Sequence, residues 1–171
     1  MVIWSRLYFD LEPYLTERSA DGTNVLGFYH RQLGEVVTES FLAGGAKRER
    51  HISLAQFFQG QEYFLESLEA QRERVLRLPP SPRPANLRKA SELAWHILHA
   101  EQWEELDLLL TNLSFLEAKV EAGMVFDLAS DFTAALKAIP GERPQRRILR
   151  LLEEALRRDI HFIARHPTTL F

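Results

Sequence analysis

The stretch LAWHILHAEQWEEL, residues 93–106, decides the fold class of this chain. Its apolar residues recur three and four positions apart, which is the spacing of one face of an α-helix. A second helical stripe begins at Trp103 after a short connection. Helices joined by such short connections pack as antiparallel hairpins. The sequence therefore predicts an all-helical domain, a helical-hairpin bundle or superhelix, for residues 86–171.

Helix-boundary signals extend this pattern toward the C-terminus. Asn86 is suited to N-cap the helix that contains Leu93. Ser114-Phe115-Leu116-Glu117 is a capping-box pattern and predicts the start of another helix, which Gly123 is expected to end. The last helix is predicted from about Pro144 to Arg165, with these residues facing inward: Ile148, Leu152, Ala155, Leu156 and Ile163.

Residues 1–60 combine helical stripes with one turn signal. An amphipathic helix is predicted around Leu7 and Leu11, ending near Pro13. The cluster at residues 19–24 contains Asp-Gly and predicts a β-hairpin between residues 15–19 and 25–30. Helical stripes then run through Phe41 and Phe58 on either side of Gly44-Gly45. The expected fold is mainly α with one short β-hairpin.

The strongest boundary signal lies between these two regions. Residues 61–78 are rich in Glu and Arg and are predicted to form a helix, and prolines follow at positions 79, 80, 82 and 84. Such a cluster is typical of a semi-rigid linker. We therefore expect a lobe at residues 1–60, a helix and Pro-rich linker at 61–85, and an all-helical domain at 86–171.

Composition excludes several classes of function. The formal net charge of −3 provides no global field that would attract nucleic acid or an anionic membrane. The absence of cysteine excludes disulfides and thiolate metal sites. The sequence shows neither a signal peptide nor an apolar run of about 20 residues, the length of a membrane span. We expect a cytoplasmic protein without nucleic-acid or membrane partners.

Catalytic and metal-binding patterns are weak. Gly44-Gly45-Ala46-Lys47 lacks the first glycine and the hydroxyl of a phosphate loop and is expected to be an interhelical turn. There is no Gly-x-Ser-x-Gly elbow and no thiol nucleophile. His96 and His99 are three residues apart and could share a metal, but no third ligand lies at a suitable spacing. We expect no enzymatic activity, no cofactor of the chain's own and no metal site.

His30 leaves two interpretations open. It follows Phe28 and Tyr29 at the end of the predicted strand and directly precedes a helix. A histidine there can point its ring at an anion near the strand end. It can equally be a structural histidine that is hydrogen-bonded to the backbone.

Two regions resemble STAND-class NTPases of the NACHT and NB-ARC type. WSRL at residues 4–7, FYHRQL at 28–33 and RH at 50–51 resemble the end of the winged-helix subdomain in that class. Residues 93–106, 109–113 and 116–119 are similar to the helical domain that follows it. The resemblance covers residues 4–139. It implies a partial winged helix before the helical domain, and downstream WD or tetratricopeptide-type repeats.

The resemblance also implies roles for individual residues. In that class the histidine of a Phe-x-His pattern contacts the β-phosphate of bound ADP and stabilises the closed state. The matching residues here are His30, as nucleotide sensor, and Phe28, as its packing partner. The phosphate loop and the Mg-binding acidic strand are absent from this chain, which we expect to be a fragment or a shortened gene product. ADP or ATP is therefore expected only in the intact parent protein.

The expected function is a non-catalytic regulatory and interaction module of a signalling NTPase, which couples nucleotide state to downstream repeats. The main alternative is a free-standing helical protein–protein adaptor, and an enzyme with an unrecognised site ranks last. Partners are expected to be protein: the rest of the NTPase, the downstream repeats, or a second copy of the chain. The predicted interaction surface includes Trp4, Leu7 and Trp103.

Overall fold

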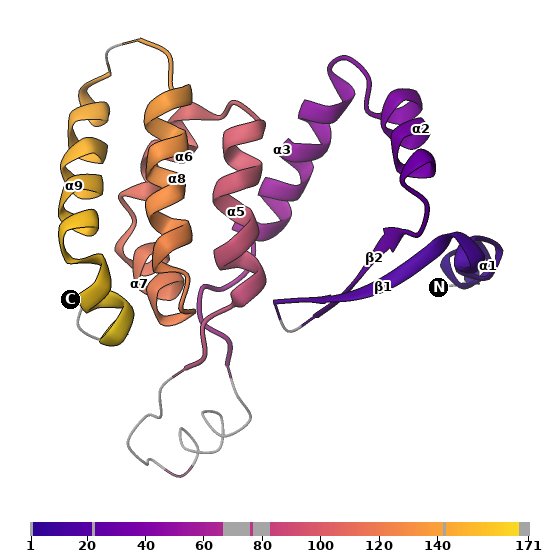
Figure 1. Ribbon diagram of the computed structural model, residues 1–171, viewed down its shortest axis with the longest axis horizontal. Helices are drawn as coiled ribbons and strands as arrows, with labels where there is room; N and C mark the ends of the chain where they lie inside the picture. The colour runs from indigo at the N-terminus through magenta and orange to yellow at the C-terminus, as the bar shows by residue number, and fades with distance from the viewer. Residues whose placement is uncertain (1, 22, 67–75, 77–82, 142, 168–171) are drawn as a thin grey trace. The chain divides into compact units, whose positions relative to one another are not determined.

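The computed structural model describes residues 2–21, 23–66, 76, 83–141 and 143–167, and describes side chains from Ser5 onward (Figure 1). The chain forms two compact units, Met1–Arg50 and His51–Phe171. The division falls within helix α3 (Ala46–Gln59). This is earlier in the chain than the proline-rich segment at which the sequence predicted the junction.

The first unit contains the predicted β-hairpin. Helix α1 (Val2–Leu11) leads through a 3₁₀ turn (Glu12–Tyr14) into strand β1 (Leu15–Ala20). Strand β2 (Thr23–Phe28) pairs antiparallel with β1, with Leu15 opposite Phe28 and Ala20 opposite Thr23. The reversal uses Asp21 at a positive φ of 51°, a conformation that aspartate tolerates better than most residues. Helix α2 (Arg31–Phe41) follows, which confirms a mainly α chain with a short hairpin.

The second unit is helical throughout its named elements. These are the later part of α3, followed by α5 (Leu87–His99), α6 (Trp103–Leu110), α7 (Leu113–Glu121), α8 (Val125–Ala138) and α9 (Pro144–Arg165). Helix α5 packs against α6, α7 and α8, and α8 packs along α9 (Figure 1). Among the residues described, no helix has the length and apolar character that crossing a membrane requires.

Capping residues fix the helix boundaries in this unit. The Asn86 side chain accepts a hydrogen bond of 3.1 Å from the backbone N–H of Lys89, which confirms it as the N-cap of α5. Helix α7 begins earlier than predicted, because the Asn112 side chain caps it by accepting from the N–H of Phe115 at 3.2 Å. Gly123 follows its C-cap at a φ of 77°, as expected for a terminating glycine.

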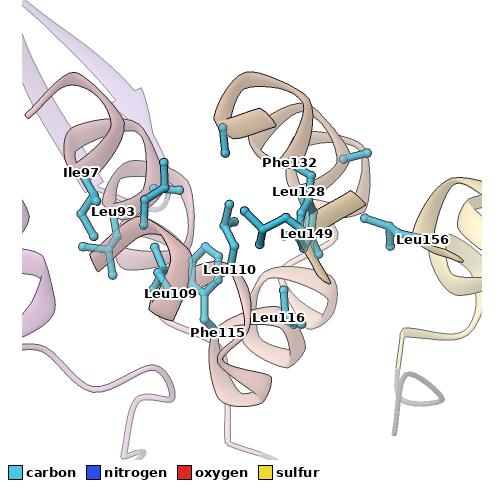
Figure 2. Packing of buried hydrophobic residues seen from close by; sticks show 14 of the residues in the cluster. Leu93, Ile97, Leu109, Leu110, Phe115, Leu116, Leu128, Phe132, Leu149 and Leu156 are labelled. Atoms are coloured by element: carbon cyan, nitrogen blue, oxygen red, sulfur yellow. The ribbon is translucent and has the colours of Figure 1, made fainter. Parts of the chain in front are cut away.

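The core of the second unit is a continuous cluster of aliphatic and aromatic side chains (Figure 2). Phe115, Leu93 and Leu149 are each fully buried and come from α7, α5 and α9. The predicted buried face of α9 is partly wrong: Ile148 is 51% exposed and Ala155 is also exposed, while Leu149, next to Ile148, is buried. The inward stripe of α9 consists of Leu149, Leu152, Leu156, Ile160 and Ile163.

Residues 61–66 and 83–85, the two described ends of the predicted linker, lie side by side. Phe64 forms an antiparallel bridge with Ala85, and the backbone N–H of Leu65 donates to the carbonyl of Pro84 at 2.8 Å. Residues 61–66 are not helical, while most of the helix predicted at 61–78 lies outside the described residues. Both ends therefore belong to the second unit, and residues 66 and 83 are brought close together.

Two lysines are buried at the edges of the core. Lys89 is 2% exposed and donates to the carbonyls of Gln59, the last residue of α3, and of Gln61. Its Nζ atom lies 3.8 Å from the centroid of the Tyr63 ring. Lys119 is 1% exposed and forms an ion pair with Asp131 of α8. Each buried ammonium group therefore has oxygen partners, as low-dielectric surroundings require.

Candidate functional site

His30 lies at the junction between β2 and α2. It is the N-cap residue of α2, with extended backbone angles of φ −99° and ψ 127°, and its side chain forms no capping hydrogen bond. The imidazole is exposed and meets the Tyr29 ring edge-on, with ring centroids 4.9 Å apart. The ring is thus held beside an aromatic neighbour and remains accessible to a ligand.

Phe28 packs on the first turns of α2. Its Cδ2 atom lies 3.6 Å from the position that a β-carbon on Gly34 would occupy. The Phe28 side chain is nevertheless 38% exposed. The aromatic neighbour of His30 is Tyr29, a residue to which the sequence prediction gave no role. A β-carbon at position 34 would therefore make an ordinary van der Waals contact with the Phe28 ring.

The positive charge next to His30 in the sequence, on Arg31, is paired with a carboxylate. The Arg31 Nε atom donates to Glu35 at 2.7 Å in an i,i+4 pair on the surface of α2. This pair is exposed, so its contribution to stability is small. An anion near His30 would meet one imidazole and a guanidinium already shared with a carboxylate.

The first unit exposes most of its large apolar side chains. Among its described residues, 5–21 and 23–50, none is buried. Leu7 is 46% exposed, as the predicted interaction surface requires, whereas the side chain of Trp4 lies outside the described residues. The other exposed large apolar residues of this unit are Phe9, Tyr14, Leu26, Phe28, Tyr29, Val36 and Phe41. The helical spacing through Val36 and Phe41 identified an apolar stripe, but this chain does not bury it.

Trp103 and Trp95 differ in exposure. Trp103 is half-buried and packs against the core of the second unit. Trp95 is 46% exposed, and its ring lies 4.1 Å from the His99 ring. Sequence reasoning did not give Trp95 an interaction role, although its place on α5 opposite the buried Leu93 and Ile97 stripe was a usable signal.

A histidine cluster connects α3 to α5. The Nδ1 atoms of His51 and His96 are 2.9 Å apart, so one ring must donate and the other accept. Burial lowers the pKa of His96, and the charges of His99 and Arg88 lower it further. Glu92 Oε2 lies 3.4 Å from the Nε2 atom of His96. The lowered pKa of His96 favours a hydrogen bond between two neutral imidazoles, His51 on α3 and His96 on α5.

His96 and His99, whose spacing alone would allow a shared metal, have other contacts. The Nδ1 atom of His99 contacts the backbone oxygen of Trp95 at 2.8 Å, so it donates a proton there and is unavailable as a ligand. Within the part of the chain that the structure describes, no group of three or more histidine or acidic side chains could hold a metal ion.

Comparisons with known proteins match the helical unit. A family model described as the APAF-1 helical domain matches residues 81–170. The chain is 36% identical over 150 residues to the NACHT domain- and WD repeat-containing protein 1 of Homo sapiens, and 34% identical over 150 residues to the protein of that name from Mus musculus. Each alignment covers 77% of this chain and 9% of the relative, so the chain spans a small part of their length. No solved structure matches it.

Proposed function

The chain belongs to the APAF-1 helical-domain family, and from this membership we propose that it is a non-catalytic regulatory module of a signalling NTPase. The observation that carries the proposal is the match of the helical unit together with the identity to a NACHT- and WD-repeat-containing relative. These matches confirm the resemblance of the helical region to STAND-class NTPases. In the proposed role, the module couples the nucleotide state of the parent protein to repeats that follow.

The first unit is assigned to the winged-helix part of that NTPase. Helix α1 and the β-hairpin that follows it would correspond to the recognition helix and wing of a winged helix. Its described residues include no buried side chain, while Phe9 and Phe41 are 71% and 70% exposed. Apolar surface of this extent favours packing against further protein. This supports an assignment in which other parts of the NTPase cover it.

His30 is proposed to sense the β-phosphate of ADP in the intact parent, with Phe28 supporting the strand end. The exposed imidazole and the absence of a side-chain cap at His30 are consistent with this role. The nucleotide cradle would come from the parent protein. The isolated chain is expected to show no ATP turnover, because its sequence has no phosphate loop. Phosphate release above background that is abolished by a mutation in this chain would contradict this expectation.

A chimera tests the coupling directly. The matching segment of the human relative is replaced by this chain, and dissociation of a fluorescent ADP analogue is measured. His30→Ala should accelerate dissociation roughly tenfold to hundredfold, the effect of losing one charge-assisted hydrogen bond. His161→Ala is the matched control, because His161 is an exposed histidine on α9 in the other unit. Equal rates in the His30 variant and the unmodified chimera would refute the sensor role.

The free-standing adaptor is retained as a second candidate because of one groove. Residues of α7, α8 and α9 line an apolar hollow of about 540 Å³, which includes Leu113, Leu128 and Phe162. Grooves of this size and character accept apolar side chains of a partner. A chimera that binds no nucleotide, together with a stable protein complex of the isolated chain that Phe162→Ser disrupts, would favour the adaptor.

A further inference from the structure

Four arginines lie on one side of α9 at its N-terminal end, from the N-cap residue Arg143 to Arg150. Arg143, Arg146, Arg147 and Arg150 are spaced by three, one and three residues, which places them on a common face. With Leu151 they line a hollow of about 460 Å³. The first turn of α9 contains no acidic residue. Because the helix dipole favours acidic residues there, this arginine face works against the stability of its own helix.

Two of the four arginines have structural partners within the chain. The Arg146 guanidinium donates to the carbonyls of Ile139 at 2.7 Å and Leu136 at 2.6 Å, and so satisfies the end of α8. The Arg143 guanidinium donates to Glu104 at 2.8 Å. These contacts hold one side of the hollow in place and explain why two of the arginines are present.

Arg147 and Arg150 have no such explanation. Both are exposed, and neither forms a hydrogen bond or ion pair with any residue that the structure describes. Two aliphatic residues lie beside them on the open side of α9: Ile148 is 51% exposed and Leu151 is 57% exposed. Arg150 interacts with Glu153 through its charge, without a hydrogen bond. The surface therefore offers guanidinium groups that no hydrogen bond holds, next to apolar side chains.

We propose that the arginine face binds an acidic segment of a protein partner. Carboxylates of that segment pair with Arg147 and Arg150, because the planar guanidinium fork matches carboxylate geometry. An aliphatic side chain of the same segment contacts Leu151. The four arginines are followed on α9 by the exposed Glu154, and Arg157 and Arg158 beyond it are each paired with a carboxylate, in a chain whose net charge is −3. A duplex or a lipid surface presents phosphates over a wider area and would meet that acidic residue.

Fluorescence anisotropy with the full chain tests the proposal. The probe is a short fluorescein-labelled peptide that repeats the unit Glu-Glu-Leu, and a Gln-Gln-Leu repeat is the neutral control. Arg147→Gln/Arg150→Gln should weaken binding of the acidic peptide roughly tenfold, since two charge-assisted contacts are lost. The matched control is Arg18→Gln/Arg165→Gln, which removes the same charge from exposed positions outside this face.

Each outcome of this experiment decides the question. A loss confined to Arg147→Gln/Arg150→Gln, with a smaller loss in Leu151→Ser and weaker binding at higher salt, supports the proposal. An equal loss in both arginine pairs shows only an effect of net charge and overturns it. Binding of the neutral peptide as tightly as the acidic one also overturns it. Preference for inorganic phosphate, a DNA duplex or phosphatidylserine vesicles over the acidic peptide refutes a protein partner.

Discussion

Replacing Lys119 with methionine tests whether the buried ion pair between α7 and α8 depends on both partners. Lys119 is 1% exposed, and the Asp131 side chain with which it pairs is 19% exposed. Methionine fills most of the lysine volume without its charge, so the Asp131 carboxylate remains in an environment with little water. Removing one partner of such a pair costs about 3–5 kcal/mol. The partial exposure of Asp131 places the expected loss near the lower end, about 3 kcal/mol.

The pH dependence provides an independent check. Burial raises the pKa of Asp131, whereas the charge and hydrogen bond of Lys119 lower it. Lys119→Met removes the two lowering contributions, so the native pKa of Asp131 rises further above its unfolded value. The native state of the variant then binds the proton more tightly than the unfolded state does. The destabilisation should therefore be largest at neutral pH and should shrink as the pH falls through the native pKa of Asp131.

Urea denaturation followed by circular dichroism measures these effects at roughly pH 7 and roughly pH 5. Lys119→Met/Asp131→Leu is the matched control, because replacing both charges by apolar groups is often neutral or stabilising. The double variant should recover most of the stability that the single variant loses. A loss below about 1 kcal/mol at neutral pH, or a double variant as unstable as the single one, would refute the reasoning.

Three further outcomes follow from individual residues. His30→Ala should leave the urea midpoint nearly unchanged, whereas Phe28→Ala should lower the free energy of unfolding by about 2 kcal/mol. This is less than the roughly 3–5 kcal/mol of a buried phenylalanine, because Phe28 is 38% exposed. Equal losses in the two variants would make His30 a packing residue. Burial lowers the pKa of His96, so the stability of the chain should fall as the pH drops below the pKa of about 6.5 that a histidine has in the unfolded state. Thermal melts of His96→Gln should show a weaker fall, and an unchanged dependence of the melting temperature on pH would contradict this. Exposed apolar surface including Leu7 should cause self-association that Leu7→Ser weakens, and sedimentation of the unmodified chain as a monomer at high concentration would argue against it.

Local signals in the sequence determined the elements of this fold. The spacing of apolar residues predicted the helices of the second unit, because one face of a helix must be buried for the helix to be stable in a domain. Asp-Gly at positions 21 and 22 predicted the hairpin between β1 and β2, since that dipeptide favours a tight reversal. Asn86 was identified as an N-cap because it directly precedes a helical stripe and its side chain can accept a backbone N–H. Each signal acts within a few residues of the structure that it specifies.

The tertiary structure decided which side of each element is used. Helix α9 has neighbouring apolar residues at 148 and 149, and contact with the core selected Leu149, because only one stripe can face α8. His51 and His96 are 45 positions apart, so no local pattern could place their Nδ1 atoms 2.9 Å from each other. In the same way, Trp103 packs inward while Trp95 stays exposed, although both occur in the stretch that identified the fold. Periodicity determines that a helix forms, and the surfaces of its neighbours determine which of its side chains remain available for binding.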